Sequence, residues 1–97
     1  MTKWFVSRHP GALDWAQRNA IGFDRHVTHL ALQDIAAGDS VIGSLPVNLA
    51  AEVCERGAAY WNLSLRLPAG DRGRELSGDD LQRHEAGLER YDIRKLP

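Results

Sequence analysis

The sequence is poor in cysteine and lysine and has no long hydrophobic run. Its single cysteine, Cys54, cannot form an intramolecular disulfide, which favours a reducing compartment. No apolar stretch approaches the roughly 18 residues that a membrane span requires, and the first residues lack the apolar region of an export signal. We therefore expect a cytoplasmic protein that has no membrane partner.

The chain also has almost no net charge. The net charge of -1, from 12 basic and 13 acidic residues, excludes a protein that coats long nucleic acid through counterion release. All basic residues except Lys3 and Lys95 are arginines. Arginine pairs well with phosphate oxygens, so this bias mildly favours an anionic ligand held at a defined place, although a GC-rich genome produces the same bias.

The familiar catalytic motifs are absent. There is no dinucleotide glycine fingerprint, P-loop, nucleophile elbow, cysteine pair or zinc-binding helix motif. His26-Val27-Thr28 matches one His-x-Thr pair of the two-histidine phosphoesterases, which need two such copies. His26 and His29 would face opposite sides of a strand, so they do not suit a shared metal. We interpret both as ordinary edge-strand histidines and expect no metal and no cofactor.

What the sequence does contain is one small α/β domain over residues 1–97. A chain of 97 residues with 43% hydrophobic residues is too short to join a cofactor domain to a substrate domain. Chains of this size bury only about 60–65% of their unfolded surface. A large ligand must therefore lie at the surface or between subunits, and a partner subunit would add stability.

Apolar runs and amphipathic stretches alternate along the chain and predict a three-layer fold. Short helical crossovers between strands favour a mainly parallel, four-stranded sheet that is covered on both faces. The second strand is polar and is expected at an edge. The expected strands cover residues 4–6, 25–30, 40–45 and 60–67. The first expected helix covers 10–19, and the second begins at Pro46 and ends before Gly57, which supplies a left-handed C-terminal stop.

The last predicted helix has the clearest start signal. Ser77 is expected as its N-cap with Asp80 at the third helical position, and Leu76 and Leu81 occupy the positions of a hydrophobic staple. The apolar stripe continues at helical spacing as far as Tyr91. We therefore predict a helix from Ser77 through Tyr91.

The aromatic and basic residues of the second half have simple structural interpretations. Residues 60–67 alternate, so Trp61 and the leucines should pack on one face while the other face stays polar. Trp15 and Trp61 are interpreted as core residues rather than base-stacking platforms. Arg72 and Arg74 belong to a solvated loop, whereas Arg66 on the polar strand face is a better phosphate contact.

Two turns carry the candidate site, because open α/β sheets bind ligands beyond the carboxyl ends of their strands. The turn Ser7–Gly11 offers a hydroxyl, a guanidinium and an imidazole, and Gly43–Asn48 offers a hydroxyl and a carboxamide. Both lead into helices whose first N–H groups attract anions. The candidate catalytic residues are Ser7, Arg8 and His9, and the candidate ligand-binding residues are Gly11, Gly43, Ser44, Asn48 and Arg66.

Each of these polar residues also has a structural alternative. Ser7 and Ser44 could only cap helices, Arg8 could only pair with an acidic side chain, and Asn48 could only satisfy a turn. His9 is harder to explain in this way, because an imidazole in a tight turn at the ligand-bearing edge is well placed for proton transfer.

Long strings around the two turns closely resemble a small CRISPR-associated family. Residues Phe5–Ala12 and Gly38–Cys54 carry the resemblance, which extends through Leu63–Leu65 and Arg74–Ser77 and so covers most of the chain. The family is the Csx-series family numbered sixteen, an accessory of type III CRISPR systems. Ser44 departs from the family pattern, which has Thr there, but the hydroxyl is kept.

The resemblance implies a compact Rossmann-like domain, related to CARF sensor domains, that pairs as a homodimer around cyclic oligoadenylate. It further implies a ring nuclease that opens cyclic tetra-adenylate and so ends type III antiviral signalling. A two-fold ring suits a two-fold dimer. RNA supplies its own nucleophile in the 2′-hydroxyl, so the protein needs mainly to orient the ribose and stabilise charge, without a metal.

In this interpretation Arg8 stabilises the phosphorane and His9 acts as acid or base. Two other classes remain open. The protein could be a non-catalytic module that senses or sequesters the cyclic messenger, since orienting a 2′-hydroxyl needs no diagnostic nucleophile. It could also be an interaction protein without a nucleotide ligand, in which case the two polar turns are only helix caps.

Overall fold

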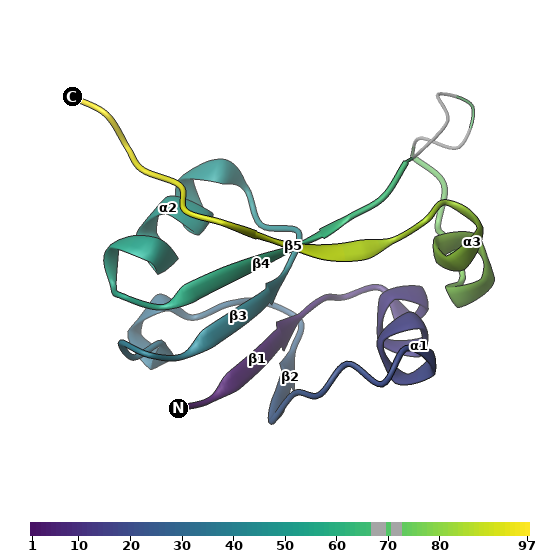
Figure 1. Cartoon of the computed structure of the whole chain (residues 1–97), viewed down its shortest axis with the longest axis horizontal. Coiled ribbons are helices and arrows are strands. Elements are labelled where there is room, and N and C mark those ends of the chain that lie inside the picture. Colours follow the sequence, from purple (N-terminus) through teal and green to yellow (C-terminus); the bar gives the residue numbers. More distant parts are fainter. Residues whose placement is uncertain (67–69, 71–72) are drawn as a thin grey trace.

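Strands and helices alternate along the chain in the computed structural model, which describes residues 1–66, 70 and 73–97 (Figure 1). The predicted strand end at Leu67 and the loop residue Arg72 lie outside the described residues. The elements are β1 (Lys3–Val6), α1 (Pro10–Arg18), β2 (Arg25–Val27), the short 3-10 helix η1 (Leu32–Asp34), β3 (Ser40–Gly43), α2 (Val47–Glu55), β4 (Ala59–Ser64), α3 (Gly78–Arg83) and β5 (Gly87–Tyr91).

The sheet has the strand order β2-β1-β3-β4-β5. The first four strands are parallel neighbours, and β5 runs antiparallel to β4. The α/β class, the mainly parallel sheet and the edge position of β2 confirm the prediction, but four strands was wrong, because the sheet has five. This order is a doubly wound one whose direction of winding reverses between β1 and β3. Val6 pairs with Gly43 there, so these two strands end side by side.

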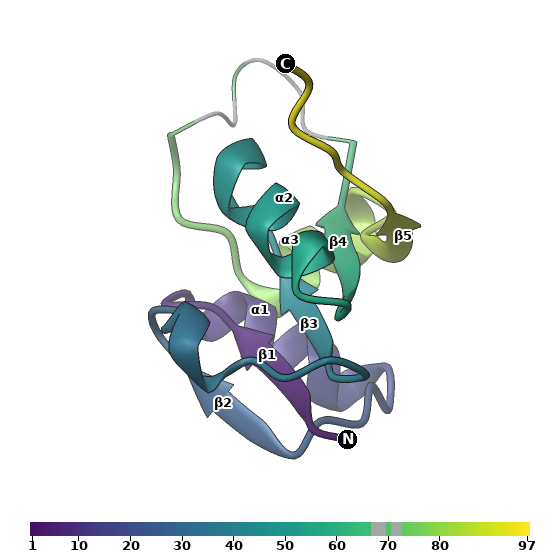
Figure 2. The ribbon, with the colours of Figure 1, turned by 90° about the vertical axis from the view of Figure 1, so that its left-hand side faces the viewer.

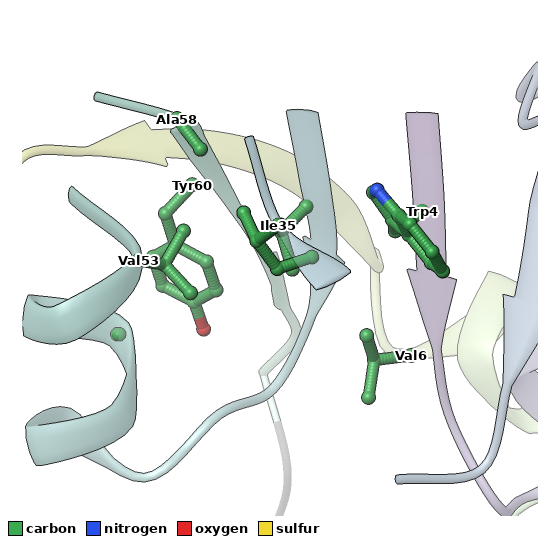
Figure 3. Close-up of a cluster of buried hydrophobic side chains, with 8 residues drawn as sticks. Trp4, Val6, Ile35, Val53, Ala58 and Tyr60 are labelled. Atoms are coloured by element: carbon green, nitrogen blue, oxygen red, sulfur yellow. The ribbon is translucent and has the colours of Figure 1, made fainter. Parts of the chain in front are cut away.

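Apolar side chains cover both faces of the sheet. Figure 2 shows α2 on one side and α1 with α3 on the other. The α2 side holds one buried cluster, in which Val53 lies against the ring of Tyr60 (Figure 3). The α1 and α3 side holds a second cluster that includes Phe5 and Trp15, with Trp61 packed against it. Trp15 is 3% exposed and Trp61 is half-buried, which confirms their interpretation as packing residues.

Helix α3 begins as predicted and ends earlier than predicted. The Ser77 hydroxyl accepts the Asp80 N–H at 3.1 Å, and the Asp80 carboxylate accepts the Ser77 N–H at 3.0 Å. These two bonds form a capping box. The helix ends at Arg83 because Glu85 adopts a left-handed φ of 57°. The predicted continuation to Tyr91 was therefore wrong, since residues 87–91 form β5.

The face of β4 that carries Tyr60, Asn62 and Ser64 also differs from the prediction. Tyr60 was expected on a polar face, but it is 1% exposed and belongs to the α2-side cluster. The physical reason is that β4 has neighbours on both sides and helices over both faces, so neither face meets solvent along its whole length. Asn62 and Ser64, on the same face, are half-buried and bonded to each other at 2.8 Å.

At the end of the sheet where the parallel strands begin, which we call its amino edge, a buried carboxylate joins β1 to the chain before β3. Asp39 is 5% exposed and accepts the Thr2 N–H at 2.9 Å, the Ala36 N–H at 3.0 Å and the Trp4 indole N–H at 3.2 Å. The bonds from Thr2 and Ala36, followed by that from Trp4, lower the pKa of Asp39 below its usual range. The partners of this carboxylate thus come from the chain itself.

Candidate functional site

A cleft opens where β1 and β3 end. Its volume is about 640 Å³, within the usual range of small-ligand pockets. Its described lining includes the first turn (7–9), the second turn (43–46), residues 28–30 after β2 and residues 74–76 before α3. Doubly wound sheets bind ligands at this place, where the winding direction reverses. The structure thus brings together the two turns that the sequence singled out.

The first turn is held from two sides. Its backbone N–H at Ser7 donates to the Val27 carbonyl at 3.0 Å, and Nε2 of His26 donates to the Ser7 carbonyl at 2.8 Å. His26 therefore fixes the turn. The Ser7 hydroxyl accepts the His9 N–H at 3.1 Å. The N-cap of α1 is His9, without a side-chain cap bond, so Ser7 does not cap this helix and its own O–H remains available to a ligand.

Arg8 is exposed and lines the cleft. Within the described residues, no hydrogen bond or ion pair involves its side chain, in contrast to the alternative that it only pairs with an acidic side chain. A guanidinium in this position offers paired donors to phosphate oxygens. The start of α1 adds few donors, because Pro10 has no N–H and the Ala12 N–H donates to the His9 carbonyl at 3.1 Å.

His9 is paired across the cleft wall with Glu75. Its Nδ1 lies 3.0 Å from Oε1 and 3.3 Å from Oε2 of that carboxylate. Both side chains remain more than half exposed, and both line the cleft. Sequence reasoning did not single out Glu75, because no local pattern links two residues that are 66 positions apart.

The second turn depends on a glycine and a tyrosine. A Cβ on Gly43 would lie 2.7 Å from the Val6 carbonyl oxygen, so glycine allows β1 and β3 to approach closely at the cleft. The Ser44 hydroxyl donates to the Leu63 carbonyl at 3.1 Å and is therefore no helix cap. The N-cap of α2 is Pro46, without a side-chain cap bond.

The buried Tyr60 side chain supports this second turn. Its hydroxyl accepts the Leu45 N–H at 3.0 Å and lies 2.6 Å from Oδ1 of Asn62. Burial is the main cause of the raised pKa of Tyr60, which keeps the hydroxyl protonated and able to donate. Sequence alternation suggested only a polar strand face, so this supporting role was missed.

Three candidate residues lie outside the described lining. Gly11 is buried, and a Cβ there would lie 1.9 Å from the Leu76 carbonyl oxygen, so its structural role is close packing. Asn48 is exposed in the first turn of α2. Arg66 lies 3.6 Å from Glu85 at the surface. The five candidates that line the cleft are Ser7, Arg8, His9, Gly43 and Ser44.

The wall formed by residues 74–76 is anchored to α3. Arg74, expected in a solvated loop, lines the cleft and also donates to Asp80 at 3.3 Å. The backbone bond from Ser77, then the bond from Arg74, lowers the pKa of Asp80 to about 2. His29, interpreted as an ordinary edge histidine, also lies in the cleft lining.

The described part of the chain contains neither a cluster of metal ligands nor a membrane-spanning helix. Among residues 1–66, 70 and 73–97, no three His, Cys, Asp or Glu side chains are grouped as metal ligands would be. Over the same residues, no helix has the length and apolar character that crossing a bilayer requires.

These features define a small α/β protein with a doubly wound sheet and, at the point where the winding reverses, an open cleft in which a few polar groups stand among apolar side chains. The chain belongs to the family described as "Putative CRISPR-associated protein (Cas_VVA1548)", whose model matches residues 4–94. No curated protein and no solved structure gives a significant match. Family membership supports the CRISPR association that the sequence resemblance implies.

Proposed function

We propose that the protein is a ring nuclease with a Rossmann-like, CARF-like fold. It binds cyclic tetra-adenylate between two copies of the chain and cleaves it, which ends type III CRISPR signalling. The observation that carries this proposal is the cleft itself, which Arg8, His9 and Ser44 line beside the start of α2, a helix without a side-chain cap. Membership of a CRISPR-associated family supports the same assignment.

The chemistry follows from the groups in the cleft. A ribose 2′-oxygen attacks the adjacent phosphorus in line, so the O2′–P bond forms while the P–O5′ bond breaks. The 2′-hydroxyl loses its proton to a base, and the leaving 5′-oxygen gains one. His9 carries out one of these proton transfers, and Arg8 neutralises charge on the phosphorane. The products end in a 2′,3′-cyclic phosphate and a 5′-hydroxyl, with no metal required.

A second copy of the chain completes the site. The cleft of about 640 Å³ is open on one chain, and a two-fold ring presents the same groups to each half of a two-fold dimer. Val47, in the first turn of α2 beside the cleft, is 69% exposed and suits a contact between the two copies. Four phosphates need only local donors, which a chain of net charge -1 supplies.

The experiment that tests this function uses purified protein and radiolabelled cyclic tetra-adenylate, with and without EDTA. We expect linear fragments ending in a 2′,3′-cyclic phosphate, at the same rate in EDTA. Retention of the intact ring on the protein would instead support the sensor alternative. If the protein neither binds nor cleaves the ring, the proposal is contradicted, and an interaction protein is the remaining alternative.

A further inference from the structure

The pairing of His9 with Glu75 defines the state of the imidazole. The carboxylate oxygens lie 3.0 and 3.3 Å from Nδ1. An ionised carboxylate only accepts hydrogen bonds, so Nδ1 carries the proton and donates it to Glu75. In the neutral ring Nε2 then carries the lone pair, and it is the nitrogen left for a ligand in the cleft.

The backbone fixes both partners independently of this pair. His9 is the N-cap of α1, and its N–H is bonded to the Ser7 hydroxyl at 3.1 Å. On the other side, the Leu76 carbonyl packs so closely on Gly11 that no Cβ fits between them, and the capping box begins one residue later. The folded backbone therefore places the two side chains within reach of each other.

A purely stabilising role does not explain the pair. The two side chains are 54% and 64% exposed, and exposed ion pairs contribute little to stability. The wall at residues 74–76 is already held by Gly11 packing and by Arg74 bonding to Asp80. What the pair does change is the ring of His9, namely its tautomer and its orientation.

We infer that Glu75 is a positioning residue that makes His9 the general base of the proposed cleavage, an assignment that rests on the proposed function. Glu75 holds the Nδ1–H tautomer and directs Nε2 towards the substrate. Nε2 takes the proton of the attacking 2′-hydroxyl, and the resulting imidazolium is stabilised by the carboxylate on Nδ1. This arrangement assigns to Glu75 a role that acts only through His9.

A double-mutant cycle separates this role from a structural one. Single-turnover cleavage and affinity for the ring are measured for wild type, Glu75→Gln, His9→Ala and the double variant. We expect Glu75→Gln to lower the cleavage rate about 10- to 100-fold with little change in affinity, and Glu75→Asp to recover part of the loss. In the His9→Ala background, Glu75→Gln should have no further effect.

The matched control is Glu55→Gln, the same change on the exposed last residue of α2, which should cleave as wild type does. An equal loss from Glu75→Gln in both His9 backgrounds would overturn the inference, as would a loss confined to affinity.

A second readout does not depend on cleavage. The ¹⁵N chemical shifts of the His9 ring report its tautomer, and wild type should show Nδ1–H. Glu75→Gln should give a mixture, because an amide donates to and accepts from Nδ1 equally well. If the wild-type protein cleaves nothing, the proposed function fails while these spectra still decide the positioning claim. An Nε2–H tautomer in wild type would refute it.

Discussion

The two edges of the sheet use polar residues in opposite ways. At the amino edge, the Asp39 carboxylate is buried and saturated by Thr2, Trp4 and Ala36. At the carboxyl edge, Arg8 and Ser44 are exposed and line an open cleft. Buried polar groups without partners are costly, so the first network is closed within the chain, whereas the cleft holds groups whose partners can come from outside.

The difference teaches where function can be sought in a small α/β domain. Both edges contain charged residues, so charge alone does not separate them. The separation comes from the donors and acceptors that remain available, such as the Arg8 guanidinium, the Ser7 hydroxyl proton and the N–H groups at the start of α2, which has no side-chain cap. Changes at the amino edge should therefore affect stability, and changes at the carboxyl edge should affect chemistry.

The largest expected effect lies at the carboxyl edge. Replacing His9 by Ala should lower single-turnover cleavage of cyclic tetra-adenylate by about 10²- to 10⁴-fold, because general acid or base help is removed. Replacing Arg8 by Ala should lower it by about 10²- to 10³-fold and weaken binding as well. Arg56→Ala, at the far end of α2, is the control and should be near wild type. Unchanged cleavage in both cleft variants would remove the first turn from the site.

Gly11 lies at the carboxyl edge but is expected to behave as a packing residue. An added methyl group would lie 1.9 Å from the Leu76 carbonyl oxygen, so the chain before α3 must move. We expect Gly11→Ala to lower the free energy of unfolding by about 1–3 kcal/mol in urea denaturation. Gly22→Ala is the control, since nothing lies within 4 Å of its added Cβ. Equal stabilities for the two variants would contradict this assignment.

The amino edge should lose its stability in acid. Because the pKa of Asp39 lies below the ordinary 3.8, its contribution is present above that pH and is lost as the pH falls through the lowered value. The thermal stability of wild type should therefore fall more steeply below pH 3.8 than that of Asp39→Asn. Asp92→Asn, in the exposed C-terminal segment, should retain the wild-type slope. Parallel slopes for wild type and Asp39→Asn would contradict the closed network.

Asp80 provides the same test on the α3 side of the cleft. With a pKa of about 2 in the folded chain and 3.8 ordinarily, its contribution to stability should disappear between those two pH values.

The smallest expected effect concerns the support of the second turn. Tyr60→Phe removes the hydroxyl that accepts the Leu45 N–H and donates to Asn62. We expect a loss of about 1 kcal/mol in the free energy of unfolding, because a net hydrogen bond contributes about that much. Cleavage should fall only a few-fold. The benign control is Tyr91→Phe, whose ring is 45% exposed. A cleavage loss as large as that of His9→Ala would contradict a supporting role and show that the Tyr60 hydroxyl takes part in the reaction.

Local signals predicted much of this fold. The Ser77 and Asp80 pair identified the start of α3, and Gly57, with its left-handed φ of 86°, marked the turn after α2. The end of α3 was not predictable, because the left-handed residue there is Glu85 and not glycine. Leu88 fits a helical stripe after Leu81, yet in β5 it packs on the same cluster.

The sequence-based prediction missed the fifth strand and the Glu75 carboxylate for the same reason. Strand β5 exists because it pairs with β4 across the helical insertion, and Glu75 meets His9 across most of the chain. Both depend on contacts between distant segments, which spacing and propensity do not encode. The turns at Ser7 and Ser44 were predictable because strand ends in a parallel sheet meet at one edge.

The most direct test of the central claim is the stoichiometry of ring binding. Isothermal titration with a 2′-deoxy cyclic tetra-adenylate, which lacks the nucleophile and stays intact, should give one ring for two chains. Binding should be much weaker for Arg8→Ala and unaffected by Asp39→Asn in protein that remains folded. One ring for each chain, or undiminished binding by Arg8→Ala, would contradict a ligand held between two carboxyl edges.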